Sequence, residues 1–211
     1  MQIEGKEVLK YILERLERVL DRSSVMIATS DTPGDDAIAV FAEREGIACY
    51  RGSLEDVASR FYQAARSKGW QYAVRINGDN IFLDTNVLEA MIRIARTAGH
   101  DFISNVKGRT FPRGMSVEIV RLDYYERVLG TVRMDDQYQE HVTLYLYEHP
   151  GQGDHYYFYN SIVPEAAGIQ LALDTPEDLA RTREIISRFS EPHWEYNLEE
   201  IFVIWRDLGY E

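Results

Sequence analysis

The chain has 211 residues, 45% of them apolar and 27% charged, and its 35 acidic residues outnumber its 23 basic residues to give a net charge of −12. These values are ordinary for one soluble globular domain, and the excess of acidic residues argues against general binding to nucleic-acid phosphates. The single cysteine, Cys49, excludes an internal disulfide and any metal centre built from several cysteines. We expect a cytoplasmic protein without membrane contact, since no segment approaches ~20 consecutive apolar residues and the N-terminus lacks a signal-peptide core.

The first half of the chain alternates between helix-like and strand-like segments. Apolar residues recur every four positions within 8–20, which predicts an amphipathic helix. Short apolar runs then alternate with segments of helical pattern that end near a glycine, and this alternation predicts a parallel α/β sheet of the nucleotide-binding type. The predicted strands are 25–29, 47–50, 72–76 and 101–104, and the predicted helices between them are 32–46, 53–69 and 85–98. We expect Thr32 and Ser53 to cap the first two of these helices.

The pattern changes after residue 105. The segments expected there are a loop at 107–114, a strand at 117–120, an aromatic-rich helix at 136–148, a loop at 149–154, strands at 156–162 and 169–173, a helix capped by Thr175 with Asp178, and a last helix at 198–208. We therefore expect a core formed by 1–105, a smaller α+β insertion at 106–168, and a return to the core at 169–211.

Two aspartates occupy positions where an α/β sheet can bind a ligand. Asp79 follows the strand 72–76, and Asp174 ends the predicted strand 169–173. Ligands of open α/β sheets bind beyond the carboxyl ends of the strands, and Mg²⁺ prefers oxygen ligands. The pair suggests a magnesium site divided between two strands. The alternative is that Gly78-Asp79 only forms a turn, and the spacing alone does not decide between the two.

Seven short segments, in order along nearly the whole chain, carry a resemblance to a known family. They are Gly5-Lys6 with the helix to Leu20, Ala28-Thr-Ser30 with Asp35-Asp-Ala-Ile38, Arg51-Gly-Ser53 with Asp56-Val57 and Arg60, Arg75-Ile-Asn-Gly-Asp79 with Leu83-Asp84, Phe111-Pro-Arg-Gly114 with Val117-Glu118, Glu140-His-Val-Thr143 with Tyr147-Glu-His-Pro150, and Asp174-Thr-Pro-Glu-Asp-Leu179. With these segments the chain resembles the cytidylyltransferases of the spore-coat polysaccharide biosynthesis protein F group. Acylneuraminate cytidylyltransferases and CMP-Kdo synthetases are more distant relatives. The resemblance implies a three-layer, Rossmann-like fold of the nucleotide-diphospho-sugar transferase type.

The activity that the resemblance implies is transfer of CMP from CTP to a hydroxyl group of a sugar or sugar acid, with release of pyrophosphate. Asp79 and Asp174 match the family's Mg²⁺-binding acids, and Arg75 lies beside them in the motif. The residues that correspond to the nucleotide site are Ala28, Thr29, Ser30, Arg51, Gly52, Ser53 and Arg60. The residues that correspond to the acceptor side are Arg75, Arg113, Glu118, Glu140 and His141. A surface ion pair stays open as the alternative for Arg113 and Glu118, and a packed helix residue for His141.

The resemblance breaks at the start of the chain. Relatives open with a strand in the middle of the sheet and a loop of the form A-R-x-x-S-x-R-x-P-x-K, and neither precedes the Gly5-Lys6 helix here. Because that loop surrounds the triphosphate, we expect weak CTP binding and little turnover from these 211 residues. The alternatives are a non-catalytic protein that binds a nucleotide or sugar, and an assembly subunit whose open sheet accepts a strand from another chain. A homodimer through the middle region is a further expectation, and its tyrosines would form either that surface or part of the core.

Overall fold

The computed structural model describes residues 1–210 and arranges the strands in three groups. The largest is a four-stranded sheet of order β5-β7-β6-β8, in which β7 runs antiparallel to both of its neighbours. The second group is the parallel pair β3 and β4, and the third is a short N-terminal hairpin of β1 and β2. The strands are β1 (Gln2–Ile3), β2 (Lys6–Glu7), β3 (Met26–Ser30), β4 (Ala48–Gly52), β5 (Tyr72–Arg75), β6 (Phe102–Ser104), β7 (Glu118–Arg121) and β8 (His155–Tyr157).

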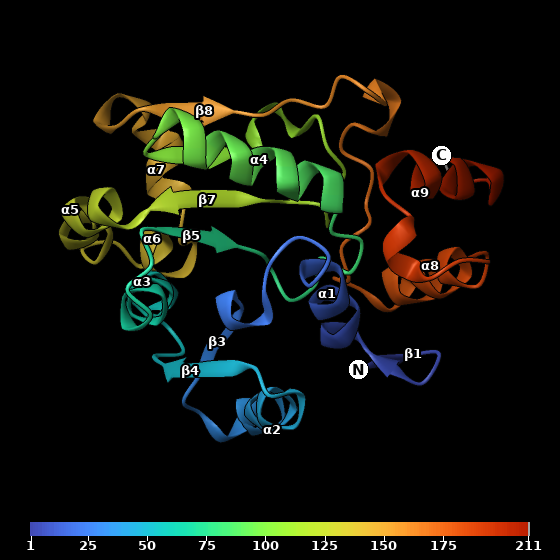
Figure 1. Ribbon diagram of the computed structural model, residues 1–211, viewed down its shortest axis with the longest axis horizontal. Coiled ribbons are helices and arrows are strands. Elements are labelled where there is room, and N and C mark those ends of the chain that lie inside the picture. Colours follow the sequence, from blue (N-terminus) through green and yellow to red (C-terminus); the bar gives the residue numbers. More distant parts are fainter. Residues whose placement is uncertain (211) are drawn as a thin grey trace.

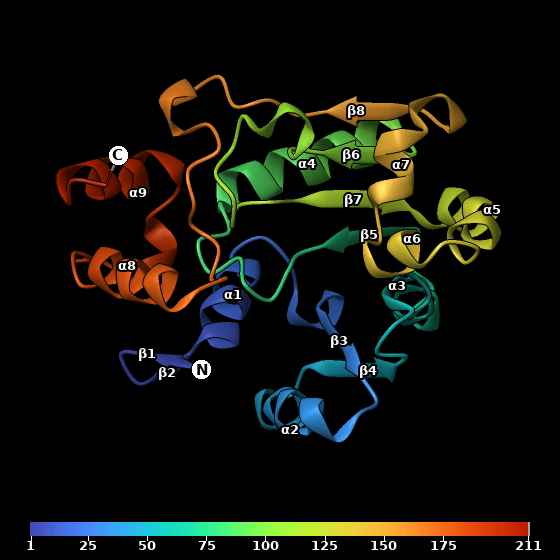
Figure 2. The same cartoon turned by 180° about the vertical axis from the view of Figure 1, so that it is seen from behind.

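Helices pack around these strands and confirm the predicted α/β class. α4 covers one face of the four-stranded sheet, α8 and α9 lie together at one end of the molecule, and α5, α6 and α7 lie at the other (Figures 1 and 2). The helices are α1 (Val8–Leu16), α2 (Asp36–Glu45), α3 (Val57–Ser67), α4 (Thr85–Ala98), α5 (Leu122–Val132), α6 (Asp136–Glu140), α7 (Leu144–Glu148), α8 (Pro176–Ile186) and α9 (Leu198–Asp207). Within residues 1–210, none of the helices has the length and apolar character needed to cross a bilayer.

Local signals determine several helix ends. The Asp84 side chain accepts a hydrogen bond from the Val87 N–H at the start of α4, and Gly99 ends this helix with φ of 74°. Both features satisfy backbone groups that a helix end otherwise leaves free. The predicted capping box at the start of α8 is confirmed, because Thr175 and Asp178 each accept from the backbone of the other.

Two predicted caps are wrong. Thr32 caps nothing, and α2 begins only at Asp36 because the Asp35 carboxylate turns back to accept hydrogen bonds from the end of β3. Ser53 accepts from the Asp56 N–H in a turn, and Asp56 itself caps α3. Both helices therefore start three to four residues later than predicted, after a turn that lies beside the ends of β3 and β4.

The second half of the chain departs further from the prediction. The expected helix 136–148 is two helices, α6 and α7, and α5 was not predicted at all. The expected strand 169–173 contributes only one bridge, between Arg113 and Gln170, so it is an extended connection. Tyr124 and Tyr125 on α5 are fully buried in a cluster that also contains Tyr145, which confirms the core alternative for these three tyrosines.

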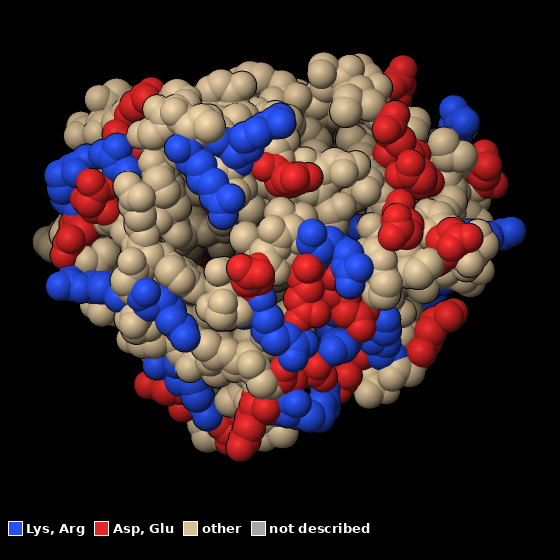
Figure 3. Space-filling view, in the orientation of Figure 1, with Lys and Arg blue, Asp and Glu red and all other residues tan. Residues whose placement is uncertain are grey.

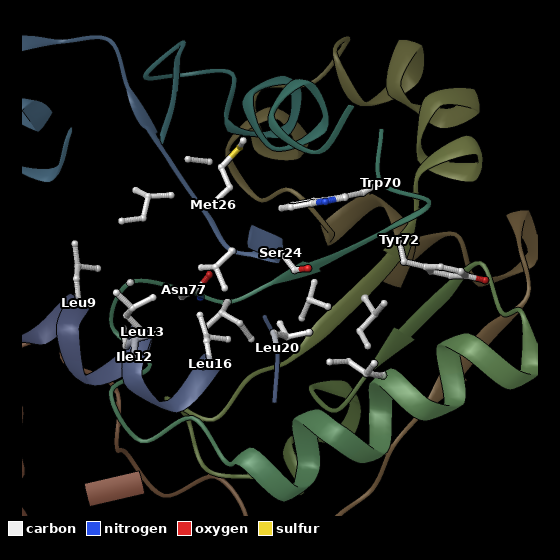
Figure 4. A pocket seen from close by; sticks show the side chains of 18 of the residues that line it. Leu9, Ile12, Leu13, Leu16, Leu20, Ser24, Met26, Trp70, Tyr72 and Asn77 are labelled. Atoms are coloured by element: carbon white, nitrogen blue, oxygen red, sulfur yellow. The ribbon is translucent and has the colours of Figure 1, made fainter. Parts of the chain in front are cut away.

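An apolar cavity of about 520 Å³ separates β3 from β5, and both of these strands lie at the edge of their sheet. Its lining extends from Trp70 and Tyr72 at the start of β5 to Asn77 beyond the end of that strand (Figure 4). α1 closes one side with a row of leucine and isoleucine side chains. Protein interiors contain few voids larger than a water molecule, so this volume interrupts the core at the place where a sheet would be continuous.

Candidate functional site

The predicted nucleotide residues come together at the carboxyl ends of β3 and β4. Strand register pairs Thr29 with Arg51 and Ser30 with Gly52. The Asp35 carboxylate accepts hydrogen bonds from the Thr29 hydroxyl at 2.8 Å and from the Ser30 N–H at 2.9 Å. These hydrogen bonds hold the pKa of Asp35 below its ordinary value, so this carboxylate stays ionised at neutral pH.

Arg51 joins the two strand ends across this corner. Its guanidinium donates to the backbone carbonyl groups of Ser30 at 3.0 Å and Thr32 at 2.9 Å, and it forms an ion pair with Asp36 at 2.8 Å. Gly52 follows in close contact with its neighbours, since a Cβ there would lie 3.1 Å from the Tyr50 ring. The corner therefore has a defined shape and little room for larger side chains.

Arg60 reaches the same corner from α3. Its guanidinium donates to the Ser53 carbonyl oxygen at 2.6 Å. Burial lowers the pKa of Arg60, and the charges of Asp35 and Asp31 oppose that change. Together with Ala28, which is exposed on β3, the seven residues predicted for the nucleotide lie on β3, on β4, on the segment that leads into α3, and, for Arg60, on α3 itself.

Asp79 lies just after β5, in the turn that leads to α4. Its Oδ1 atom is buried and has no hydrogen-bond partner among the described residues. Burial raises the pKa of Asp79, and the charge of Asp174 raises it further, whereas its own backbone N–H and Arg75 lower it. Burial of an ionised carboxylate oxygen without a hydrogen-bond partner destabilises the native state, unless a bound cation offsets the lost contact with water.

Asp174 is carried by the extended segment before α8. Its carboxylate accepts a hydrogen bond from the Gln170 amide at 2.8 Å, and the side chain is otherwise exposed. Gly114 lets this segment approach, because a Cβ there would lie 2.5 Å from the backbone of Leu171 and Ala172, and its φ of 93° is one that side chains rarely allow. The loop that contains Gly114 thus determines where Asp174 lies.

The two carboxylates suit Mg²⁺ together with a phosphate better than a metal held by protein alone. Residues 1–210 contain no group of three or more metal-ligating side chains. Magnesium usually retains several waters and is held by one or two carboxylates plus substrate phosphates. The unpartnered Asp79 oxygen and the neighbouring charge of Asp174 fit that donor set.

Arg75 is held by a buried carboxylate. Arg75 on β5 faces Glu118 on β7, and their side chains form an ion pair of 2.7 Å. The other Glu118 oxygen accepts from the Thr143 hydroxyl and the Tyr147 hydroxyl, both at 2.7 Å. Glu118 is only 5% exposed, so the alternative of a surface ion pair is wrong for this residue. Thr143 and Tyr147 lie in the motif segments, but no role was predicted for them.

The remaining predicted acceptor residues lie outside this network. Arg113 is exposed, and its backbone bridges to Gln170, next to the segment that carries Asp174. Glu140 and His141 are exposed at the end of α6, so His141 is not the packed helix residue of the alternative prediction. Neither Glu140 nor His141 has a side-chain hydrogen bond within the described residues to Asp79, Arg75 or Glu118.

Charge on the outer surface is mixed. Over α1 and α2, basic and acidic side chains alternate (Figure 3), and ion pairs such as Lys10–Glu45 and Arg44–Glu7 join them. Glu45 and Glu7 on this face thus have basic partners, whereas Asp79 and Asp174 form no ion pair within residues 1–210.

Comparison with known proteins identifies the relatives of the chain. A family model described as Cytidylyltransferase matches residues 1–204. The chain is 31% identical over 174 residues to spore coat polysaccharide biosynthesis protein SpsF of Bacillus subtilis, covering 81% of this chain and 70% of that protein. It superposes with a TM-score of 0.91 on a cytidylyltransferase from Leptospira borgpetersenii at 25% identity, covering 99% of this chain and 87% of that one. CMP:2-keto-3-deoxy-manno-octonic acid synthetase, solved with CTP, matches with a TM-score of 0.61 at 14% identity over 89% of this chain and 90% of that one, and shares the fold. The nucleotide-diphospho-sugar transferase type of fold is thereby confirmed.

Proposed function

Since the chain belongs to the cytidylyltransferase family, we propose that it transfers CMP from CTP to a hydroxyl group of a sugar or sugar acid used in surface polysaccharide synthesis. In this reaction the acceptor oxygen forms a bond to the α-phosphorus of CTP. The bond from that phosphorus to the bridging oxygen breaks, pyrophosphate leaves, and the hydroxyl proton passes to a base or to solvent. The named relative in Bacillus subtilis supports the link to polysaccharide synthesis.

The observation that carries this proposal is the buried, unpartnered Oδ1 atom of Asp79 beside the charge of Asp174. We assign both carboxylates to holding Mg²⁺ together with the phosphates of CTP. Bound Mg²⁺ supplies neutralisation of the charge on the phosphate oxygens. A carboxylate that lies at a strand end and forms no ion pair within residues 1–210 is the group expected for this task.

The other residues position the two substrates. Internal hydrogen bonds hold the corner of Thr29, Ser30 and Arg51 in a fixed shape, and we assign it to cytosine and ribose on the resemblance. Arg75 is directed by Glu118 and lies within electrostatic reach of Asp79, so its positive charge supports binding of a phosphate or of an acidic acceptor. We assign Arg113, Glu140 and His141 to the acceptor side on the resemblance alone.

We also propose that these 211 residues alone turn over slowly. The guanidinium groups of Arg75 and Arg51 already form ion pairs with Glu118 and Asp36, so they neutralise little of a triphosphate. Charge-assisted hydrogen bonds contribute roughly 1.5–3 kcal/mol each, and a site short of two of them loses about a hundredfold or more in rate.

An assay of product and pyrophosphate tests the proposal. The purified chain is incubated with CTP, Mg²⁺ and a panel of sugars and sugar acids, and CMP-sugar is identified by mass spectrometry. We expect a rate below the ~1–10³ s⁻¹ range of typical enzymes, and Asp79→Asn and Asp174→Asn to abolish it. Glu126→Gln, in an exposed ion pair with Arg66, is the control and should leave the rate unchanged.

The outcomes separate the two candidate functions. CTP binding without product from any acceptor would support a non-catalytic nucleotide-binding protein, which the paired state of Arg75 and Arg51 favours. Absence of both CTP binding and product would contradict the proposed function.

A further inference from the structure

We propose that Asn80 is a positioning residue, which joins the turn that carries Asp79 to the loop that places Asp174. Asn80 is 1% exposed, so it acts through the two carboxylates and not by contact with a substrate. The inference rests on the proposed function for what the two carboxylates bind. The link between the two segments belongs to the fold itself, so it can be measured without nucleotide or metal.

Asn80 lies in the turn between β5 and α4, directly after Asp79. Its Nδ2 atom donates a hydrogen bond of 2.9 Å to the Ser116 carbonyl oxygen, although the two residues are 36 positions apart in sequence. Its backbone N–H donates to the Asn77 carbonyl oxygen, and its own carbonyl oxygen accepts from the Leu83 N–H. The backbone of Asn80 is therefore held within the turn while its side chain reaches a distant segment.

The distant segment is the loop 112–117, which contacts the chain that carries Asp174. The Arg113 N–H donates to the segment 169–171 at 2.8 Å, and the Arg113 carbonyl oxygen accepts from that segment at 2.9 Å. In Figures 1 and 2 the chain that leads into α8 runs beside the chain that leads into β7. Because Asp174 follows the segment 169–171 closely, a shift of this loop would also shift Asp174.

A second buried asparagine holds the same loop from the other side. Asn105, after the end of β6, is 1% exposed and donates from Nδ2 to the Met115 carbonyl oxygen at 2.9 Å. Its Oδ1 atom accepts from the Val117 N–H at 2.8 Å. Among the hydrogen bonds of residues 1–210, the one from Asn80 is the one that joins this loop to the turn after β5. Asn105 thus holds the loop on the sheet, and Asn80 holds it next to Asp79.

The relative position of the two carboxylates matters for a metal ion held by both. The charge of Asp174 raises the pKa of Asp79, which indicates that the carboxylates lie within electrostatic reach of each other. Magnesium requires near-ideal octahedral geometry and therefore tolerates little displacement of an oxygen ligand. Groups that orient metal ligands typically contribute about 10–100-fold to metal affinity. We expect Asn80 to contribute at the lower end of this range.

Hydrogen exchange of backbone amides tests the link in the absence of nucleotide and metal. Asn80→Ala removes the side-chain donor to Ser116. We expect the Arg113 and Leu171 amides to exchange about tenfold faster or more, because their hydrogen bonds join the loop to the segment before Asp174. The Arg121 amide, bonded to the Asp101 carbonyl oxygen at the far end of β7, should keep its rate. Equal acceleration of the Arg121 amide would show a general loss of stability and would contradict the proposed link.

Metal binding tests the consequence for the site. Mn²⁺ is the probe, and its affinity for the chain in the presence of CTP is measured by electron paramagnetic resonance. We expect Asn80→Ala to weaken Mn²⁺ binding about tenfold while CTP binding without metal stays unchanged. If Asn80→Ala does not fold, Asn80→Ser should give the same loss, because its hydroxyl group is too short to reach Ser116 but can bind water.

Asn160 offers a matched control for the metal measurement. This buried asparagine donates from Nδ2 to the carbonyl oxygens of Thr110 and Val163, so it also joins two distant segments. It makes no hydrogen bond to the turn after β5 or to the segment 169–171 within residues 1–210. Asn160→Ala should therefore leave Mn²⁺ binding unchanged even where it lowers Tm. An equal loss of Mn²⁺ binding in the Asn160 and Asn80 variants would contradict a specific role of Asn80.

The outcomes separate this inference from the proposed function. Exchange rates at Arg113 and Leu171 that stay as in the parent chain would overturn the inference. Faster exchange with unchanged Mn²⁺ binding would overturn it as well, since the link would then not position the carboxylates. If Asp79→Asn abolishes Mn²⁺ binding and Asn80→Ala does not weaken it, the inference fails and the proposed function stands. A parent chain that binds no Mn²⁺ in the presence of CTP would contradict both, and faster exchange would then show a structural link alone.

Discussion

Arg75 and Glu118 face each other across β5 and β7, and their side chains meet at 2.7 Å although Glu118 is only 5% exposed. Ser104 occupies the same level of the sheet on β6, and the hydroxyl of Tyr147 reaches both Ser104 and Glu118. The buried Glu118 carboxylate, which accepts hydrogen bonds from Arg75, Thr143 and Tyr147, therefore orients the Arg75 guanidinium near Asp79. The position of Arg75 is a property of the sheet and of the α7 segment together.

Glu118→Gln removes the charge that compensates Arg75. Loss of one partner of a buried ion pair costs about 3–5 kcal/mol, and we expect about 2–3 kcal/mol here because Arg75 is 25% exposed. Urea unfolding measures this change. The matched control is Glu126→Gln, whose pair with Arg66 is more than half exposed on both sides and should cost less than ~1 kcal/mol. Equal effects of the two substitutions would show that the Glu118 network has no special stabilising role.

Asp79→Asn should stabilise the chain while it removes the proposed metal site. Burial raises the pKa of Asp79, so its ionised form is disfavoured in the native state. Native stability therefore falls as pH rises from the ordinary aspartate pKa of about 3.9 to the raised value, and stays lower above it. We expect Tm of the variant to exceed that of the parent by about 2 °C or more at pH 7, with the difference lost below about pH 4. A lower Tm at pH 7 would contradict the assigned desolvation.

Gly114→Ala tests how the loop positions Asp174. A Cβ at this site would lie 2.5 Å from the backbone of Leu171 and Ala172, and φ is 93°. We expect a loss of about 2–4 kcal/mol in the free energy of unfolding, from overpacking and backbone strain together. Gly130→Ala in α5 is the control, since nothing lies within 4 Å of its added Cβ and the change should stabilise the helix by about 0.5–1 kcal/mol. A Gly114→Ala variant as stable as the parent would show that the segment can move away freely.

His193 should make the stability of the chain depend on pH. Burial, helped by the charge of Arg15, lowers the pKa of His193 to about 4, against the hydrogen bond with Glu14. The unfolded chain then binds a proton that the native chain does not, between about pH 6.5 and that lower value. We expect Tm to fall as pH decreases through this interval, and His193→Gln to flatten the profile. His141→Gln, at an exposed position, should leave the profile unchanged, and a flat profile in the parent chain would disprove the assignment.

The elements that sequence patterns predicted well are those with strong local signals. α4 has the predicted bounds of 85–98 and ends at Gly99, and α8 begins at the predicted capping box. The start of α2 was mispredicted because Asp35, which looks like a first-turn acid, is used by the backbone and hydroxyl groups at the end of β3 instead. These hydrogen bonds of Asp35 form only in the tertiary structure, so no local sequence pattern predicts them.

The candidate site also contains residues that the sequence predicted and residues that it did not. The motif order predicted that Thr29, Ser30 and Arg51 lie together, and the parallel register of β3 and β4 places them on adjacent strands. The donors that hold Glu118 were missed, because Thr143 and Tyr147 are far from it in sequence and meet it only through packing of α7 on the sheet. The division of the chain into core and insertion, the homodimer and the roles of the acceptor residues stay predictions.

Manganese binding measured by electron paramagnetic resonance, with and without CTP, shows whether Asp79 and Asp174 hold a metal ion together with the nucleotide. Mn²⁺ replaces Mg²⁺ at oxygen ligands, and only the free ion gives the sharp solution signal. We expect the chain to bind Mn²⁺ more tightly when CTP is present, and we expect Asp79→Asn and Asp174→Asn each to weaken this binding at least tenfold while Glu126→Gln does not. Equal Mn²⁺ binding by the parent chain and both aspartate variants would contradict this metal site.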